Sequence, residues 1–187
     1  MTIESHPLQP FLPPSAHMLM LGSFPPPRAR WCMEFFYPNR TNQMWEIFGL
    51  VFYGDSQHLV DAENRTFRKE NIVQLLTEQG IAIFDTARAV RRLQDNASDK
   101  FLEVVEKTDI AALLEQIPRC TDIVCTGQKS AETLCEDYAA PPPRMGESVP
   151  LSIGGRQLRL WRMPSSSRAY PMKLEEKARY YQRVLLP

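Results

Sequence analysis

Four short polar segments, each following a run of apolar residues, carry the groups best suited to bind a ligand. Gly22 would let a ligand approach the backbone closely, and Ser23 with the amides around it could hold a carbonyl group or a water molecule. Gly127 and Lys129 stand where a strand would turn into a helix, a place where amides favour an anionic or carbonyl oxygen. Loops are polar in most proteins, but a position at the ends of strands favours a functional role. The segments are GSFPPPRAR (22–30), DTARAVRR (85–92), TGQKSA (126–131) and PSSSRAY (164–170).

The last of these segments has the composition of a phosphate clamp. Ser165, Ser166 and Ser167 offer hydroxyls and amides just after a predicted strand, and Arg168 adds a positive charge.

A cluster of aromatic residues and asparagines, FFYPNRTNQMW (35–45), is the second unusual feature. Thr41 or Asn42 is a plausible N-cap of a predicted helix that begins here, and Asn is a strongly preferred N-cap residue. The same amide could instead contact a ligand, because it lies close in sequence to Phe36 and Tyr37. Both interpretations stay open from the residues alone, and they are compatible.

The segments between these groups alternate between strand-like and helix-like patterns. Short apolar runs predict buried strands at 17–22, 81–86, 121–127 and 156–164. Amphipathic spacing predicts helices at 41–54, 68–80, 108–118, 128–138 and 174–186. This alternation predicts a three-layer α/β/α sandwich around a central, mostly parallel four-stranded sheet. Ligands bind such sheets beyond the carboxyl ends of the strands, which is where the four polar segments fall.

Composition sets the broad class of the protein. The chain is 43% hydrophobic and 24% charged, which is typical of a globular protein, and no linker or repeat divides 1–187, so a single domain is expected. Its 22 basic and 22 acidic residues cancel, so net charge gives no indication of a nucleic-acid partner, although a local basic patch stays possible. No apolar run approaches the ~18 residues of a membrane span, and the N-terminus lacks a signal-peptide layout. A cytoplasmic protein is expected, in which the sequon at Asn96 is accidental.

Several common chemistries find no support in the sequence. Neither phosphate-binding nor dinucleotide-binding glycine motifs occur, and no G-x-S-x-G nucleophile elbow is present. His6, His17 and His58 lie outside the four polar segments, which argues against a Ser–His–Asp hydrolase. The four cysteines form no C-x-x-C pair and are expected to be free residues, mostly of the core.

Taken together, several segments resemble the uracil-DNA glycosylase superfamily, most closely its family-6, hypoxanthine-DNA glycosylase-like group. That group carries a G-S-F-P-S loop, an F-Y-Y-G-H-P-R-N-R-F-W segment and a late L-P-S-x-S-P-A-N loop followed by a helix. The order matches here, the middle segment aligns without a gap, and the resemblance runs from about residue 18 to residue 185. The matching segments are LGSFPPPRAR (21–30), FFYPNRTNQMW (35–45), GIAIFDT (80–86), IVCTGQKSA (123–131), RMPSSSRAY (162–170) and LEEKARYYQRVL (174–185).

The resemblance implies an enzyme that flips a deaminated base out of duplex DNA and hydrolyses its glycosidic bond. Gapless matching places Tyr37 at the base-stacking position with Phe36 beside it, and Trp45 in the core behind them. It gives Asn42 a catalytic role, either in orienting the attacking water or in contacting the base. The remaining expected residues are catalytic Ser23; base-binding Gly22, Phe24, Gly127 and Lys129; and DNA-binding Ser165, Ser166, Ser167 and Arg168.

The chain also departs from the family pattern. Pro26, Pro38, Asn39 and Arg168 replace residues that the group carries at these places. Superfamily branches with strong uracil activity have an acidic or amide residue in the first loop and a His before the late Pro-Ser, where this chain has Ser23 or Phe24 and Met163. The base that is excised therefore stays open between hypoxanthine, uracil and xanthine.

Two other functions stay open beside a monofunctional DNA glycosylase. One is a non-catalytic nucleic-acid-binding module on the same fold, and the other is a small-molecule α/β enzyme unrelated to DNA. For the glycosylase, damaged DNA is the expected partner, with no cofactor, no metal and no membrane, and the protein is expected to be a monomer.

Overall fold

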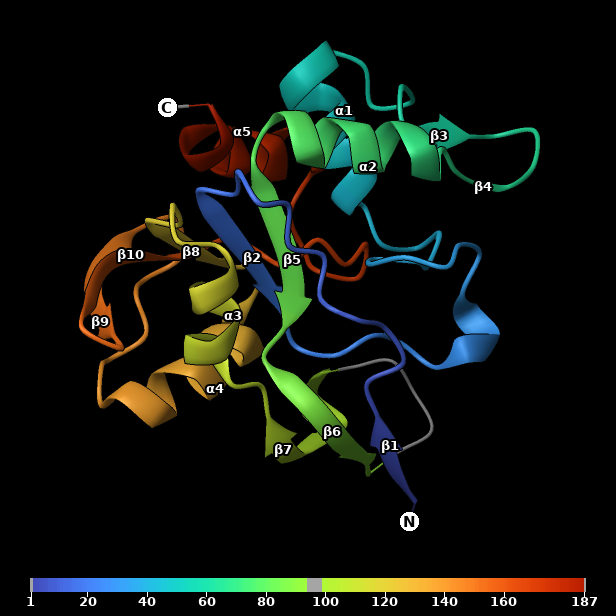
Figure 1. Ribbon diagram of the computed structural model, residues 1–187. Coiled ribbons are helices and arrows are strands. Elements are labelled where there is room, and N and C mark those ends of the chain that lie inside the picture. Colours follow the sequence, from blue (N-terminus) through green and yellow to red (C-terminus); the bar gives the residue numbers. More distant parts are fainter. Residues whose placement is uncertain (1, 94–98, 187) are drawn as a thin grey trace.

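A five-stranded sheet forms the centre of the computed structural model, which describes residues 2–93 and 99–186 (Figure 1). In spatial order its strands are β5 (Ile81–Asp85), β2 (Met18–Gly22), β8 (Asp122–Cys125), β10 (Arg156–Arg162) and β9 (Ser148–Ile153). The first four pair in parallel, and β9 pairs with β10 in the antiparallel sense. The predicted fold class is confirmed, and the four predicted strands are the four parallel ones.

The predicted number of strands was too low by one, because β9 was missed. Pro150 interrupts its pattern, and proline cannot donate a ladder hydrogen bond. The strand lies at the edge of the sheet, where proline is tolerated, opposite Arg159 of β10. Gly154 and Gly155, both at positive φ, form the hairpin turn between the two strands.

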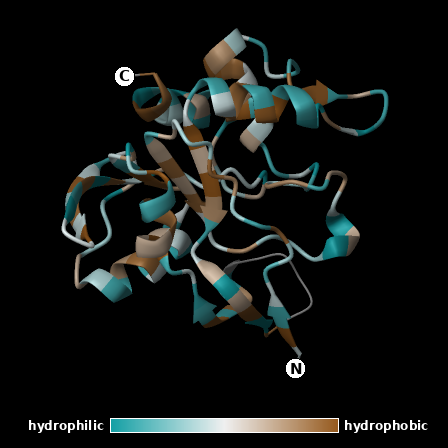
Figure 2. Ribbon diagram, viewed as in Figure 1, coloured by the Kyte–Doolittle hydropathy of each residue, from teal (hydrophilic) through white to brown (hydrophobic). Residues whose placement is uncertain are grey.

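Helices cover both faces of the sheet and complete the three layers. Figure 1 shows α1 (Met44–Tyr53), α2 (Lys69–Glu78) and α5 (Leu174–Leu185) gathered on one side, with α3 (Ile110–Gln116) and α4 (Gln128–Tyr138) on the other. Strands β2 and β5 are buried along their whole length, so both of their faces are apolar. In Figure 2 the hydrophobic colour accordingly runs along the central strands, while the helices carry both hydrophobic and hydrophilic residues.

A second, smaller sheet lies beyond the carboxyl end of β5. It consists of β1 (Ile3–Ser5), β6 (Ala87–Arg92) and β7 (Leu102–Lys107), in the order β1-β6-β7 with antiparallel pairing throughout. The segment after β5 had been expected to be a loop. It forms a strand because Val90 and Leu102 pack with Phe24 in a separate hydrophobic cluster. The smaller sheet thereby fixes the loop that follows β2.

The remaining elements are short. They are the hairpin β3 (Val60–Asp61) and β4 (Thr66–Phe67) and the 3₁₀ helices at Arg28–Arg30 and Asp99–Phe101. The sequon at Asn96 lies outside the described residues. Cys120, Cys125 and Cys135 are buried and Cys32 is half-buried, all as free thiols. No helix in the described part of the chain is long and apolar enough to cross a membrane.

Helix α1 begins at Met44, three residues later than predicted, because residues 41–43 pair with the serine segment instead. Asn42 forms an antiparallel bridge with Ser167, and the Gln43 amide donates to the carbonyl of Ser166 at 2.8 Å. The Arg168 amide donates to the carbonyl of Thr41 at 3.0 Å. Two segments more than a hundred residues apart in sequence are thus joined through their backbones.

Candidate functional site

A cavity of about 880 Å³ opens at the carboxyl ends of β2, β5 and β8, within the size range of small-molecule sites. Residues of all four polar segments line it, as the position of these segments after the strands had indicated. Of the residues expected to act on a ligand, it is lined by Gly22, Ser23, Phe24, Phe36, Tyr37, Asn42, Gly127, Ser165, Ser166, Ser167 and Arg168. Lys129 does not line this cavity; it lines a neighbouring depression of about 440 Å³, together with Arg162.

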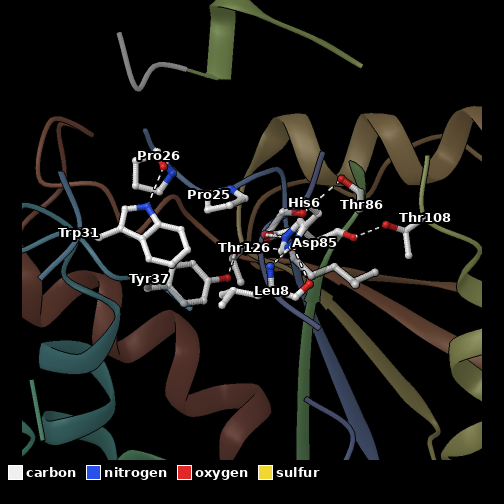
Figure 3. A network of polar contacts seen from close by, with 12 residues as sticks. His6, Leu8, Pro25, Pro26, Trp31, Tyr37, Asp85, Thr86, Thr108 and Thr126 are labelled. Carbon is white, nitrogen blue, oxygen red and sulfur yellow. Dashed lines mark hydrogen bonds and ion pairs between the residues drawn. The ribbon is translucent and has the colours of Figure 1, made fainter. Parts of the chain in front are cut away.

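Backbone hydrogen bonds fix the first loop beside the end of β5. The Thr86 amide donates to the Gly22 carbonyl at 2.8 Å, and the Ala87 amide donates to the Ser23 carbonyl at 3.2 Å. The prolines that follow cannot donate, but their carbonyls accept from side chains. Trp31 donates its indole N–H to Pro26 at 2.7 Å (Figure 3), and Arg92 donates to the Pro25 carbonyl at 2.8 Å.

Asp85, the last residue of β5, lines the cavity, although no specific role was predicted for it. Its neighbour across the sheet is Gly22, and a Cβ atom at position 22 would lie only 2.3 Å from Asp85 Oδ1. The glycine at 22 therefore makes room for this carboxylate. The sequence had suggested that Gly22 makes room for a ligand.

Asp85 forms a hydrogen bond with His6, which the N-terminal strand brings to the sheet edge (Figure 3). His6 Nε2 lies 2.8 Å from Asp85 Oδ2, and the two side chains are only 1% and 9% exposed. The His6 ring packs against Phe84 and Phe24, with centroids 4.5 Å and 5.3 Å away. Seventy-nine residues separate the two partners, and no local pattern in the sequence indicates their contact.

The aromatic segment forms one wall of the cavity. Tyr37 has a φ of 50°, a left-handed conformation that residues other than glycine adopt infrequently. Its hydroxyl makes a 2.8 Å hydrogen bond with Thr126 Oγ1 (Figure 3), and its ring meets Trp45 edge-on. Trp45 is fully buried, in agreement with its predicted place in the core. Phe36 is 3% exposed, so most of its ring belongs to the core and only part of it reaches the wall.

Asn42 combines a structural contact with a position on the cavity. Its Oδ1 accepts from the Met44 amide at 2.9 Å, although Gln43 is the N-cap residue of α1. Asn42 therefore forms a turn one residue before the N-cap, where the sequence had predicted the N-cap itself. Because Oδ1 faces this amide, the side-chain nitrogen Nδ2 is the donor that Asn42 can offer to a ligand.

The serine segment is partly self-contained. The Ser165 and Ser167 hydroxyl oxygens accept from the amides two residues further on, at 3.2 Å and 3.3 Å. Ser166 is 2% exposed, and its carbonyl accepts from the Gln43 amide, so it joins the serine segment to the start of α1. Arg168 reaches Glu46 Oε2 at 3.3 Å, with more than half of its side chain exposed.

A buried lysine on α5 supports the junction of the two segments. Lys177 Nζ donates to Gln43 Oε1 at 2.9 Å and to the Ser167 carbonyl at 2.7 Å, and the residue is 0% exposed. Burial lowers the pKa of Lys177, the positive charge of Arg168 lowers it further, and Glu46 opposes the shift. The sequence carried a signal for this residue, because Lys177 falls within the apolar stripe of its amphipathic helix.

The described residues contain no group of three or more His, Cys, Asp or Glu side chains placed to hold a metal ion. The chemistry available at the cavity is that of one carboxylate, two carboxamides (Asn39 and Asn42), several hydroxyls, aromatic surface and the cationic side chains of Arg30, Lys100 and Arg168. Such a set can stack a planar ring and read its hydrogen-bonding edge.

Comparison with known proteins identifies the fold. No family model matches the chain, and no curated protein sequence matches it. Among solved structures, the chain is similar to the solution NMR structure of a protein from Methanosarcina acetivorans that carries a provisional name, uracil DNA glycosylase. The TM-score is 0.63 at 20% sequence identity, and the match covers 98% of this chain and 99% of the other. At this identity the likeness shows a shared fold over nearly the whole length of both chains.

Proposed function

We propose that the protein is a monofunctional DNA glycosylase, which flips a deaminated base out of the duplex and hydrolyses its N-glycosidic bond. One observation carries the proposal: a single cavity at the carboxyl ends of the strands joins an aromatic wall, the Asn42 carboxamide and the Asp85 carboxylate. The resemblance of the sequence segments to the uracil-DNA glycosylase superfamily supports it. So does the fold shared with the Methanosarcina acetivorans protein that carries that provisional name.

The aromatic wall suits a flipped base. An enzyme that acts on the sugar–base bond must take the base out of the stack and replace its stacking partners. Tyr37 provides a ring held by its own hydroxyl and by Trp45, so it would lose little conformational freedom on binding. Gly22, Phe24, Phe36 and Gly127 complete the proposed base pocket.

Asp85 offers a physical basis for distinguishing hypoxanthine from adenine and uracil from cytosine. A carboxylate only accepts hydrogen bonds. Deamination turns N1 of adenine and N3 of cytosine from acceptors into N–H donors, as hypoxanthine and uracil are formed, and xanthine also carries ring N–H groups. An unmodified adenine or cytosine would instead present a lone pair to Asp85, which is repulsive.

In the proposed reaction the bond between C1′ and the base nitrogen breaks, and its electrons leave with the base. The oxygen of a water molecule then bonds to C1′ and releases a proton, which leaves an abasic site and the free base. The Asp85 carboxylate opposes negative charge on the departing base, so selectivity has a cost in rate. We assign the opposite effect to Nδ2 of Asn42, because a positioned neutral donor stabilises such an anion. Ser23 lies in the adjoining loop and is proposed to help hold the base or the water.

The DNA backbone is proposed to cross the rim of the cavity. Ser165, Ser167 and Arg168 are suited to phosphate oxygens there, with Ser166 holding the segment in place. Lys129 and Arg162 in the adjacent depression are placed to contact a flanking phosphate, so we assign Lys129 to the backbone in place of the base. We further propose that the protein is a cytoplasmic monomer that needs no metal or cofactor.

A panel of duplexes tests the proposal. Each duplex contains one hypoxanthine, uracil or xanthine, and released bases are scored as strand breaks after alkali, with the undamaged duplex as control. Base release from at least one of them is expected. DNA binding that weakens with salt but without release from any duplex would favour the binding module, and absence of both would favour a small-molecule enzyme.

A further inference from the structure

We propose that His6 is a positioning residue, which occupies one oxygen of Asp85 so that the carboxylate presents a single acceptor to the flipped base. The N-terminal strand would then help to determine which base the enzyme accepts. The inference rests on the proposed glycosylase function and adds a residue that does not itself line the cavity.

The geometry divides the two carboxylate oxygens between protein and cavity. Oδ2 lies 2.8 Å from His6 Nε2, and His6 is absent from the residues that line the cavity. Oδ1 lies over the Cα atom of Gly22, on the side where the Tyr37 hydroxyl also approaches that glycine. Gly22, Tyr37 and Asp85 all line the cavity, and from this placement we infer that Oδ1 is the oxygen that faces it.

A single acceptor fits the edge of a deaminated base better than two. In hypoxanthine and in uracil the new N–H lies next to a carbonyl group. A carboxylate free to turn would place its second oxygen against that carbonyl, and two acceptors repel one another. Because His6 holds Oδ2 through a hydrogen bond, only Oδ1 meets the N–H of the base.

His6 is held firmly enough to perform this task. Its Nδ1 lies 3.1 Å from the Leu8 amide and 3.0 Å from the Leu8 carbonyl. The neutral ring accepts from the amide and the charged ring donates to the carbonyl, and in both forms Nε2 donates to Asp85. The His6 amide donates to the Arg88 carbonyl at 2.8 Å, which continues the pairing of β1 with β6. Phe24, Phe36 and Phe84 pack around the ring and restrict its movement.

The experiment compares His6→Leu with His6→Gln in single-turnover release of hypoxanthine and uracil, and of adenine and cytosine from undamaged duplexes. Leu removes the donor, whereas the Gln amide can place one near the position of Nε2. We expect His6→Leu to lower the rate on the deaminated base about 10- to 100-fold, the effect of losing one hydrogen bond to a charged group. His6→Leu should also lower the ratio of the release rates of the deaminated and the undamaged base. His6→Gln should restore most of the rate and most of this ratio. His58→Leu is the matched control, because His58 is an exposed residue that stacks on Tyr53.

A double-mutant cycle separates positioning from a general role in folding. If His6 acts through Asp85, His6→Leu should have little further effect on rate or preference in an Asp85→Asn background. An equal loss in both backgrounds would assign His6 to the fold alone and overturn the inference. Denaturant unfolding of the wild type, His6→Leu, Asp85→Asn and the double variant measures stability without activity. If the two substitutions change the free energy of unfolding independently, the inference is also overturned.

The outcomes distinguish the two levels of proposal. If the wild-type protein releases no base from any duplex, the glycosylase proposal fails. If it releases a base and His6→Leu does so at the same rate and with the same preference, only the role of His6 fails. Should His6→Leu not fold, His6→Asn in the wild-type and Asp85→Asn backgrounds decides, because the shorter side chain can still accept from the Leu8 amide but lacks a donor at the position of Nε2.

Discussion

Two buried aspartates stand at opposite ends of the same sheet and have different surroundings. Asp122 begins β8 at the amino end, and Asp85 ends β5 at the carboxyl end. Asp122 receives hydrogen bonds from three side chains: Trp161 at 2.8 Å, Thr121 at 2.7 Å and Arg159 at 3.1 Å. Asp85 has one oxygen bonded to His6 and the other beside a cavity.

At the amino end of the sheet, both oxygens of Asp122 already receive hydrogen bonds from the protein. Burial alone would raise the pKa of Asp122, but the hydrogen bonds from Arg159, Thr121 and Trp161 outweigh it and hold the pKa below its usual value. Nearby, Arg156 donates to the carbonyls that end α3 and the turn after it, including those of Leu114 and Cys120 at 2.6 Å each. Every one of these groups serves the fold.

The carboxyl end keeps part of its bonding capacity for a ligand. The comparison indicates that a buried aspartate is structural when protein donors surround it, and available for chemistry when one oxygen is left at a cavity. The predictions below test this division, beginning with the largest expected effect.

Asn42→Asp should separate the structural contact of Asn42, to the Met44 amide, from its proposed contact to the base. The new carboxylate can still accept from the Met44 amide, so stability should change little, but the donor nitrogen is lost. We expect base release in single turnover to fall about 10²- to 10³-fold, as for the loss of one donor to a developing anion. Asn42→Ala, which removes both contacts, should add a stability loss of about 0.5–2 kcal/mol. Unchanged turnover of folded Asn42→Asp would leave the residue a purely structural role.

Asp122→Asn should have the opposite signature at the amino end. It replaces a charge-assisted acceptor, so we expect a loss of about 1–3 kcal/mol in the free energy of unfolding at neutral pH, with turnover per folded molecule unchanged. The pKa of Asp122 is lowered by folding, so its stabilisation is present above the ordinary aspartate pKa of about 3.9 and disappears as the pH falls through the folded value. Denaturant unfolding should show wild type and variant converging below about pH 4. A difference that is constant with pH would exclude this ionic origin.

Two glycines at the carboxyl ends offer a sterically matched pair. A Cβ atom at Gly22 would lie 2.3 Å from Asp85 Oδ1, whereas a Cβ at Gly127 would meet nothing within 4 Å. Gly22→Ala should therefore displace the carboxylate, cost about 1–3 kcal/mol of stability and lower base release, since an overpacked site must shift. Gly127→Ala should be close to wild type in stability. Equal effects on stability would mean that the carboxylate moves aside freely.

The fold and the four site segments could be predicted because each depends on a local pattern. The apolar runs of β2, β5, β8 and β10 identify the strands, and polar groups after them identify the edge at which the cavity opens. The pairing of Asp85 with His6, 79 residues apart in the chain, depends on strand β1. This strand has only three residues, too few to give a pattern, and its partner β6 lies far away in sequence. Lys129 lies outside the cavity because of the direction of the first turn of α4, and sequence spacing does not determine that direction.

Tyr37 tests whether the aromatic wall at the carboxyl end acts as a stacking surface. Tyr37→Phe keeps the ring and loses the hydroxyl with its contact to Thr126, so much of the activity should remain. Tyr37→Ala should weaken binding of the flipped base by about 1–3 kcal/mol, the usual contribution of stacking on an aromatic side chain. Titration with duplexes that contain the preferred damaged base measures this, with the undamaged duplex as reference. A Tyr37→Ala protein that binds both duplexes as the wild type does would remove Tyr37 from the proposed base pocket.

Two arginines give the smallest and most direct comparison between the ends of the sheet. Arg168 and Arg159 are similarly exposed, at 58% and 63% of their side chains, and each pairs with a carboxylate. Only Arg168 lies on the rim of the cavity, so only Arg168→Ala should weaken DNA binding, by the same factor for every base sequence, and reduce the salt slope by about one. Arg159→Ala should leave the slope unchanged, because that residue lies toward the amino end and its contribution is to Asp122. Binding measured across a range of salt concentrations decides between them. Equal slopes for the two variants would show that DNA does not distinguish the two ends, and a loss that varied with the flanking sequence would indicate that Arg168 reads bases in place of phosphates.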